Sequence, residues 1–255
     1  MRTTISKIFG KIVLLGALVL GTGACSDWLD VDESNMRYVS FGTLDPVTQV
    51  ITGDYGEMLR ITEIGSNTSA EEIQTKGGRV CFNYSVLKRH DESQKNAIDI
   101  RLNSFYELLV DEIETLSTLN DEEREELGNT PATPVQAVVS GGYVNLQIAY
   151  VDRGKDDIEY DFELGYDDLE DGSTDNTLVL QIFHKGDDSG KPSKTDDVKY
   201  IWTSFKLNDD VLIKYGDKSS MDFLIMFRWK WWTSEGTIEE NMATLVPSPY
   251  SELSE

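Results

Sequence analysis

The chain has 255 residues and a mass of 28.7 kDa, enough for one or two domains of ordinary size. Its 23 basic residues face 46 acidic ones, so it lacks the basic surface that binding to a nucleic-acid backbone requires. Two cysteines are too few for a disulfide-dense scaffold, and two histidines leave little for a transition-metal site. We therefore expect a globular protein with no cofactor, no metal and no nucleic-acid partner.

Residues 1–24 have the pattern of a bacterial export signal. Three basic residues accompany an apolar run, Ile12–Leu20, that is too short to span a bilayer. Small residues then lead to Cys25, which resembles the lipobox of bacterial lipoproteins, although Thr22 stands where leucine is commoner. The resemblance implies cleavage before Cys25, lipidation of Cys25 and attachment to the membrane by acyl chains. An ordinary signal peptide with an incidental cysteine is the alternative.

The segment behind this cysteine, residues 25–35, is predicted to be an acidic tether. Its run Ser26-Asp-Trp-Leu-Asp-Val-Asp-Glu33 resembles the signals by which Bacteroidota send lipoproteins to the cell surface. Removal of residues 1–24 takes away three of the 23 basic residues and no acid, so 20 basic and 46 acidic residues remain, a net charge of −26. We expect a lipid anchor in the outer membrane, with the cell surface favoured over the periplasmic side.

The first half of the mature chain is predicted to be mainly β. Short segments rich in β-branched and aromatic residues are expected to be strands: Arg37–Thr43, Val47–Ile51, Met58–Ile64, Val80–Leu87 and Ile98–Asn103. From Ser104 to Leu116 the period changes, because Ser104 and Glu107 have the spacing of a capping box and apolar residues follow at helical intervals. We predict one short helix there, a domain over residues 36–119, and an acidic, proline-containing linker over residues 120–133.

The second half alternates apolar and polar residues more regularly. The expected strands are Val144–Tyr150, Asp157–Leu164, Leu178–His184, Tyr200–Leu207 and Met221–Trp231. One apolar face per strand is typical of antiparallel sheets covered on one side, which predicts an antiparallel β-sandwich. We assign residues 134–255 to this domain, with a tail at its C-terminal end.

The order of several strand segments resembles the NigD-like lipoproteins of Bacteroidota. In the first half the resemblance rests on Arg79–Leu87 followed by Arg101–Leu109, and in the second on Gly141–Leu146, Leu180–Asp187 and Ser204–Leu207. It implies an N-terminal OB-like barrel and a C-terminal β-sandwich. Members have no established catalytic residues, and the family name derives from a proposed bacteriocin-immunity role. The acidic insert Asp111–Leu127 and the tryptophan-rich last strand depart from the family pattern.

No constellation in the sequence supports catalysis. Cys81 lies in a strand pattern without a nearby base, so we expect a buried, unreactive thiol. His184 has no nucleophile in context, and we expect a loop-edge histidine whose ring is satisfied by the backbone. The loop Asp167–Asn176 departs from the EF-hand pattern at two ligand positions, which leaves looser calcium coordination or a solvated hairpin tip as its alternatives.

The outward face of Asp157–Leu164 is the first candidate binding surface. Asp157, Glu159, Asp161 and Glu163 would repel one another along one strand unless cations oppose them. Arg228 and Lys230 could supply that relief and leave a charge-paired solvent face. Alternatively, the face docks a basic polypeptide and does so more weakly in salt.

The tryptophans of the last strand are the second candidate surface. Trp232 is expected on the opposite face from Trp229 and Trp231, so at least one indole should lie near solvent. An exposed indole can anchor a protein interface or stack on a sugar ring, and a sandwich core with one edge tryptophan is the alternative. We expect a non-catalytic binding module that captures a basic polypeptide in an immunity-like role, with a glycan-binding accessory or a structural envelope component as alternatives.

Overall fold

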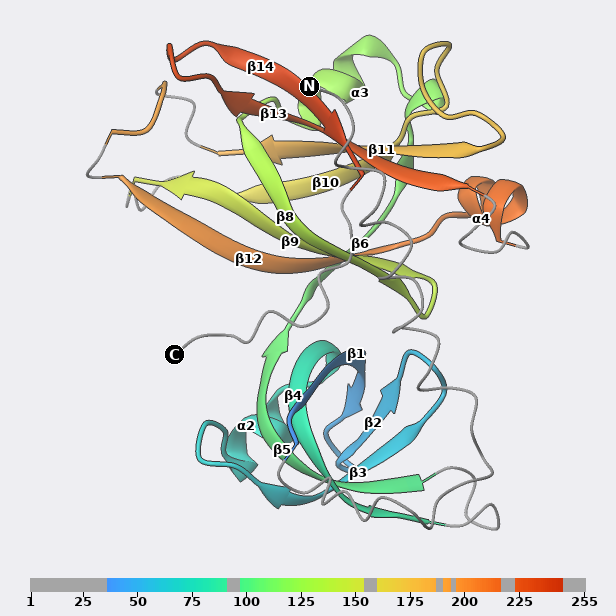
Figure 1. Ribbon diagram of the computed structural model, residues 1–255, viewed down its shortest axis with the longest axis vertical. Coiled ribbons are helices and arrows are strands. Elements are labelled where there is room, and N and C mark those ends of the chain that lie inside the picture. The colour runs from blue at the N-terminus through green and yellow to red at the C-terminus, as the bar shows by residue number, and fades with distance from the viewer. Residues whose placement is uncertain are drawn as a thin grey trace, which may run out of the picture.

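The computed structural model describes residues 36–90, 97–153, 160–186, 190–193, 196–216 and 223–244. They form two β-rich units, which lie one above the other in Figure 1: a closed barrel and a sandwich of two sheets. The predicted mainly β fold class is therefore confirmed. No helix in these described ranges is long and apolar enough to cross a membrane. The predicted signal peptide, Cys25 and the acidic tether lie outside the described residues.

The barrel is built from the first five strands. They are β1 (Tyr38–Asp45), β2 (Val50–Gly53), β3 (Met58–Ile64), β4 (Gly78–Arg89) and β5 (Ala97–Glu107). The sheet closes in the order β1-β2-β3-β5-β4, with β1 returning to pair with β4. The β3–β5 pairing is parallel and the other pairings are antiparallel. This is the five-stranded, OB-like barrel that the family resemblance implied.

The barrel encloses its own apolar core. Alternate side chains of the strands point inward, and Leu44, Ile51, Leu59 and Ile100 are almost completely buried. The helix of this unit is α2 (Ala70–Thr75), which lies between β3 and β4 and adds Ile73 to the core. A capping box between the side chains and backbones of residues 69 and 72 fixes its start.

The sandwich consists of a five-stranded sheet, β14-β13-β11-β10-β7, and a four-stranded sheet, β6-β12-β9-β8. Its strands are β6 (Leu109–Glu112), β7 (Glu114–Thr115), β8 (Ala132–Ser140), β9 (Tyr143–Asp152), β10 (Asp161–Tyr166), β11 (Thr177–Lys185), β12 (Asp197–Lys206), β13 (Leu224–Trp232) and β14 (Ile238–Ala243). Three short helices connect them: η3 (Leu116–Thr118), α3 (Asp121–Glu126) and α4 (Asp209–Tyr215). The two sheets share one core around Leu146, Leu180 and Phe205.

The sandwich is mixed, whereas we expected antiparallel pairing throughout. β6 runs parallel to β12, β7 to β10, and β11 to β13. Parallel neighbours need a crossover connection, and the chain makes one through β12 and α4 between β11 and β13. Alternation of apolar and polar residues predicts a half-buried strand, but it carries no information about the direction of the neighbouring strand.

The helix predicted over Ser104–Leu116 is absent, and this part of the expectation was wrong. The segment is almost continuously extended, through β5, β6 and β7. Its apolar residues are buried in three different places: Phe105 packs on the barrel core, Leu108 lies at the junction of the two units and Ile113 lies in the sandwich core. Hydrogen bonds from β5 to β4 and from β6 to β12 replace those that a helix would make within itself.

The passage from barrel to sandwich lies earlier in the chain than the predicted linker. The last barrel strand ends at Glu107, and β6 already pairs with the sandwich strand β12. The segment predicted as a linker over residues 120–133 contains α3 and the start of β8. The two units are therefore joined by a nearly continuous strand.

Candidate functional site

Four acidic side chains gather where the chain passes from one sheet of the sandwich to the other. Asp111 of β6, Glu114 of β7, and Asp161 and Glu163 of β10 form what we call the acidic cluster. Glu163 is half-buried, while the other three are exposed. β7 runs beside β10, with Glu114 in register with Gly165, so the two acidic strands are held side by side.

Among the described residues, acidic side chains outnumber basic ones around Glu163. Burial, together with repulsion from Asp111, Asp161 and Glu114, raises the pKa of Glu163 to about 7, against the opposing effect of Lys185. Lys185 stands opposite Asp161 in the β10–β11 register. At neutral pH Glu163 is therefore close to its midpoint, and a cation placed beside it would favour its charged form.

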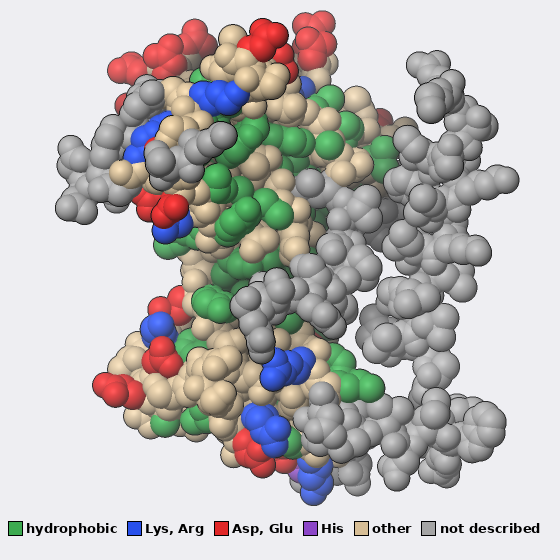
Figure 2. Space-filling model, turned by 60° about the vertical axis from the view of Figure 1, so that its left-hand side comes forward, with side chains coloured by type: hydrophobic (Ala, Val, Ile, Leu, Met, Phe, Trp, Pro, Cys, Tyr) green, Lys and Arg blue, Asp and Glu red, His purple; other side chains and the backbone are tan. Residues whose placement is uncertain are grey.

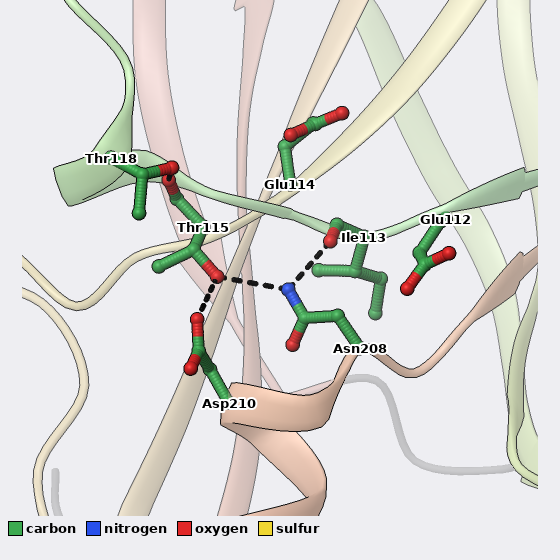
Figure 3. Close-up of a pocket in the computed structure, with 7 residues that line it drawn as sticks. All are labelled: Glu112, Ile113, Glu114, Thr115, Thr118, Asn208 and Asp210. Carbon is green, nitrogen blue, oxygen red and sulfur yellow. Dashed lines mark hydrogen bonds between the residues drawn. The ribbon is translucent and has the colours of Figure 1, made fainter.

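A cavity of about 300 Å³ adjoins this region, between β6, β7 and the start of α4. Seven residues line it: Glu112, Ile113, Glu114, Thr115, Thr118, Asn208 and Asp210 (Figure 3). Asn208 caps α4 by accepting a hydrogen bond from the backbone N–H of Val211, which sets the helix against the β6–β7 segment.

The hydrogen-bond donors in the cavity are already used. The Asn208 amide donates to the carbonyl of Ile113 at 2.6 Å and to Thr115 Oγ1 at 2.9 Å, and the Thr115 hydroxyl donates to Asp210 Oδ2 at 2.7 Å (Figure 3). Within the described part of the chain, no hydrogen bond or ion pair holds the carboxylates of Glu112 or Glu114. The cavity therefore offers acceptors and suits a donor such as an ammonium or guanidinium group.

The structure describes only two of the four residues of the predicted acidic face. Asp157 and Glu159 lie outside the described residues. Asp161 and Glu163 point outward, since the alternate residues Phe162 and Leu164 are buried in the sandwich core as the alternation predicted.

The predicted charge relief by Arg228 and Lys230 was wrong. Their strand, β13, is separated from β10 by β11, so neither side chain faces the acidic cluster. Arg228 forms an ion pair with Asp167 and lies 3.6 Å from Glu240, while Lys230 donates to Asn129 at 2.6 Å. Asp167, the first residue of the proposed calcium loop, is thus buried against an arginine, and no group of three or more metal-ligating side chains occurs among the described residues.

The three tryptophans of β13 are all shielded from solvent to some extent. Trp232 is buried, Trp229 packs against the sandwich core, and Trp231 is half-buried. The rings of Trp231 and Trp232 meet edge to face with centroids 5.0 Å apart. No fully exposed indole is found in this strand.

His184 is a core residue, not the loop-edge histidine that we expected. Its side chain is almost completely buried and stacks on Phe162 at a centroid distance of 4.5 Å. Neither ring nitrogen has a well-formed hydrogen bond within the described residues. Burial lowers the pKa of His184 to about 4, against opposing contributions from the backbones of Thr130 and Pro131. Such an imidazole is a poor base at neutral pH.

Cys81 is a buried free thiol, as predicted. It lies in the apolar cluster at the junction of the two units with Phe41 and Leu108. Burial raises the pKa of its thiol to about 12, so it is held in the unreactive protonated form.

Sequence reasoning missed Asp111, Glu112, Glu114 and Asp210 as parts of one region. The first three were interpreted as an acidic insert, and Asp210 lies nearly a hundred positions further along the chain. The only local signal was Asn208 followed by two aspartates, which is a typical helix start. The parallel pairings of β6 and β7 bring these residues together.

An OB-like barrel followed by a two-sheet sandwich defines the class of fold. No family model matches the sequence, and no curated protein is significantly similar to it. Solved structures are similar. A DUF1344 protein of unknown function from Bacteroides vulgatus has a TM-score of 0.55 and 17% identity, covering 84% of this chain and 93% of its own.

Two further solved structures share the fold at a TM-score of 0.50. A NigD-like immunity protein from Bacteroides caccae is 18% identical, with 81% of this chain and 91% of that chain covered. A protein described as toxin-related from Parabacteroides distasonis is 16% identical, with 82% and 94% covered. At these identities the comparison establishes a shared two-unit fold, the one implied by the NigD-like resemblance.

Proposed function

We propose that this chain is a NigD-like, membrane-anchored lipoprotein that serves as a non-catalytic binding module and captures a basic polypeptide in an immunity-like role. The shared fold with a NigD-like immunity protein and the lipobox-like sequence before Cys25 support the protein class. The proposed location is the outer membrane, with the cell surface favoured.

The observation that carries the proposal is the position of Glu163, half-buried among Asp111, Glu114 and Asp161. Ionisation of this half-buried carboxylate beside three other acids is energetically unfavourable. A bound lysine or arginine would stabilise the ionised form. The adjoining cavity, lined by acceptors, can accept the end of one such side chain. A glycan-binding role is less well supported, because the indoles of β13 are buried or half-buried.

The test is salt-dependent binding of a defined cationic probe. A fluorescent oligo-lysine peptide should bind the full-length protein and dissociate as salt rises, because exposed charge pairs are screened within about 10 Å at 0.1 M. The double variant Asp161→Asn/Glu163→Gln should weaken binding about tenfold, since it removes two of the four charges of the acidic cluster.

The control alters the same amount of charge in the barrel. Glu71→Gln/Glu72→Gln removes two acids from the first turn of α2 and should leave peptide affinity unchanged. Equal loss in both variants would reduce the effect to net charge and contradict a localised site. Quenching of tryptophan fluorescence by oligosaccharides, without any peptide binding, would favour the glycan alternative.

A further inference from the structure

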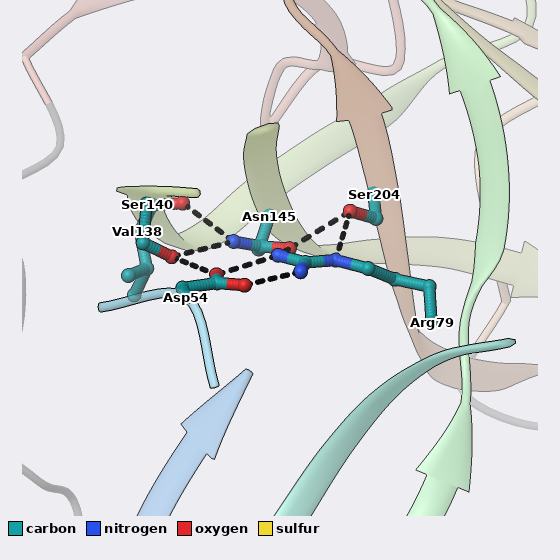
Figure 4. Close-up of polar contacts among 6 residues, drawn as sticks. All are labelled: Asp54, Arg79, Val138, Ser140, Asn145 and Ser204. Atoms are coloured by element: carbon teal, nitrogen blue, oxygen red, sulfur yellow. Dashed lines mark hydrogen bonds and ion pairs between the residues drawn. The ribbon is translucent and has the colours of Figure 1, made fainter. Parts of the chain in front are cut away.

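A buried arginine crosses from the barrel to the sandwich. Arg79, near the start of β4, has a side chain that is only 4% exposed. Its two terminal nitrogens bind the carboxylate of Asp54, which follows β2 in the barrel and is equally buried. The same guanidinium donates to Asn145 Oδ1 of β9 at 2.9 Å and to Ser204 Oγ of β12 at 3.1 Å (Figure 4).

The sandwich completes this network with its own side chains. The Ser204 hydroxyl donates to Asn145 Oδ1 at 2.8 Å, and the Asn145 amide donates to the carbonyl of Val138 at 3.1 Å and to Ser140 Oγ at 3.2 Å (Figure 4). The Ser140 hydroxyl donates in turn to Asp54. The network is therefore closed across the two units, and its buried polar atoms have partners.

An aromatic ring covers the guanidinium. The Tyr143 ring of β9 lies 4.1 Å from the Arg79 guanidinium carbon, which is within the range of a cation–π contact. The side chains that complete the surroundings of the Arg79–Asp54 pair all belong to the sandwich: Ser140, Tyr143, Asn145 and Ser204. The barrel alone would leave both charges without these partners.

Apolar packing and the backbone strengthen the same junction. Phe41 of β1 packs on Trp202 of β12 with ring centroids 5.2 Å apart, in a cluster that includes Cys81 and Leu108. Leu108 joins β5 to β6, and its N–H donates to the carbonyl of Arg79 at 3.0 Å. Hydrophobic side chains are visible on both sides of the waist between the units (Figure 2).

We infer that Arg79, Asp54, Asn145, Ser140 and Ser204 form an interdomain lock that makes the barrel and the sandwich one rigid, cooperatively folding body. Apolar contacts alone would tolerate sliding of one unit over the other, whereas a buried charged network tolerates only the orientation that satisfies every group. A ligand held by the sandwich is consequently fixed in position relative to the barrel.

The test is unfolding of the full-length protein with Arg79→Met, which keeps most of the side-chain volume and removes the charge. The wild type should unfold in one transition, with coincident signals from barrel and sandwich. The variant should unfold in two steps, the first about 10 °C below the wild-type midpoint, because Asp54 is left as an unpaired buried charge. Small-angle scattering should show a larger radius of gyration for the variant.

Arg101→Met is the matched control, since Arg101 forms a largely exposed pair with Glu63 within the barrel. It should leave the single transition and the scattering curve unchanged. Two transitions in the wild type, or an Arg79→Met protein indistinguishable from it, would overturn the lock.

A second pair of variants, in which each side chain keeps nearly its native size, decides the question if Arg79→Met fails to fold. Asp54→Asn in the barrel and Ser204→Ala in the sandwich should be non-additive, with the double variant shifting the unfolding midpoint clearly less than the sum of the single shifts. Additive shifts would mean that the two units are not coupled through this network, and the inference would be wrong.

Discussion

The barrel and the sandwich differ most in how they carry charge. Residues 36–107 contain 8 basic and 10 acidic side chains, whereas residues 108–255 contain 12 and 32. In the barrel, Arg60 pairs with Asp99 and Arg101 with Glu63, each at 2.8 Å, and His90 forms a hydrogen bond of 2.7 Å with the Asp99 carboxylate. In the sandwich, Lys185 is the one basic side chain of the described residues that opposes the raised pKa of Glu163 in the acidic cluster.

This difference in charge affects both the stability of each unit and its attraction for charged partners. Excess charge of one sign lowers the stability of a compact unit through self-repulsion, and it also attracts partners of opposite charge. The barrel balances its charges across neighbouring strands and contributes both members of the Arg79–Asp54 pair to the junction. Under the proposed function, the barrel supports the sandwich, and the sandwich carries the binding surface.

The largest effect is expected from opening a cavity in the core of either unit. Phe205→Ala in the sandwich should reduce the free energy of unfolding by about 4 kcal/mol, because Phe205 is fully buried. If the units fold together, amide protons of β4 in the barrel should lose hydrogen-exchange protection along with those of β9. Phe82→Ala is the matching change in the barrel core and should expose β9 equally. Loss of protection confined to the mutated unit would mean that the two units unfold independently.

A smaller effect is expected from acid, and it should originate in the sandwich. Burial lowers the pKa of His184 to about 4 from 6.5, so the unfolded chain takes up a proton first as pH falls. Stability is therefore lost progressively between about pH 6.5 and pH 4, by up to about 3 kcal/mol. His184→Leu should flatten urea-unfolding stability over that interval. If the stability of this variant falls with pH as steeply as that of the wild type, His184 is not the cause of the acid sensitivity.

The smallest effect concerns the acidic cluster itself. Burial and the neighbouring acids raise the pKa of Glu163 to about 7 from 4.5, so its contribution to stability is complete below pH 4.5 and lost as pH rises through 7. Glu163→Gln should therefore be more stable than the wild type at pH 8 by about 1 kcal/mol, after allowance for solvent screening of a half-exposed group. The difference should vanish at pH 4.

Local pattern predicted the strands of both units well because each strand has one buried face. β3 has the limits expected from the sequence, and the inward positions of β10 are the predicted ones. The same reasoning failed for residues 104–116, where helical spacing of apolar residues arose by chance from three separate burial sites. Asp161 and Glu163 point outward as the alternation predicted, whereas the acids of β6 and β7 beside them were not foreseen.

The sequence by itself determined that this chain is acidic, mainly β and divided into an OB-like half and a sandwich half. Those properties follow from composition, from alternation along single strands and from the resemblance to a family. The tertiary structure alone decided which strands are neighbours, that three pairs are parallel, and that Arg79 meets Asn145 and Ser204 from distant parts of the chain. The physical reason is that a side-chain pattern reports the burial of one strand face, whereas hydrogen bonds between strands and buried polar networks depend on partners that no local pattern identifies.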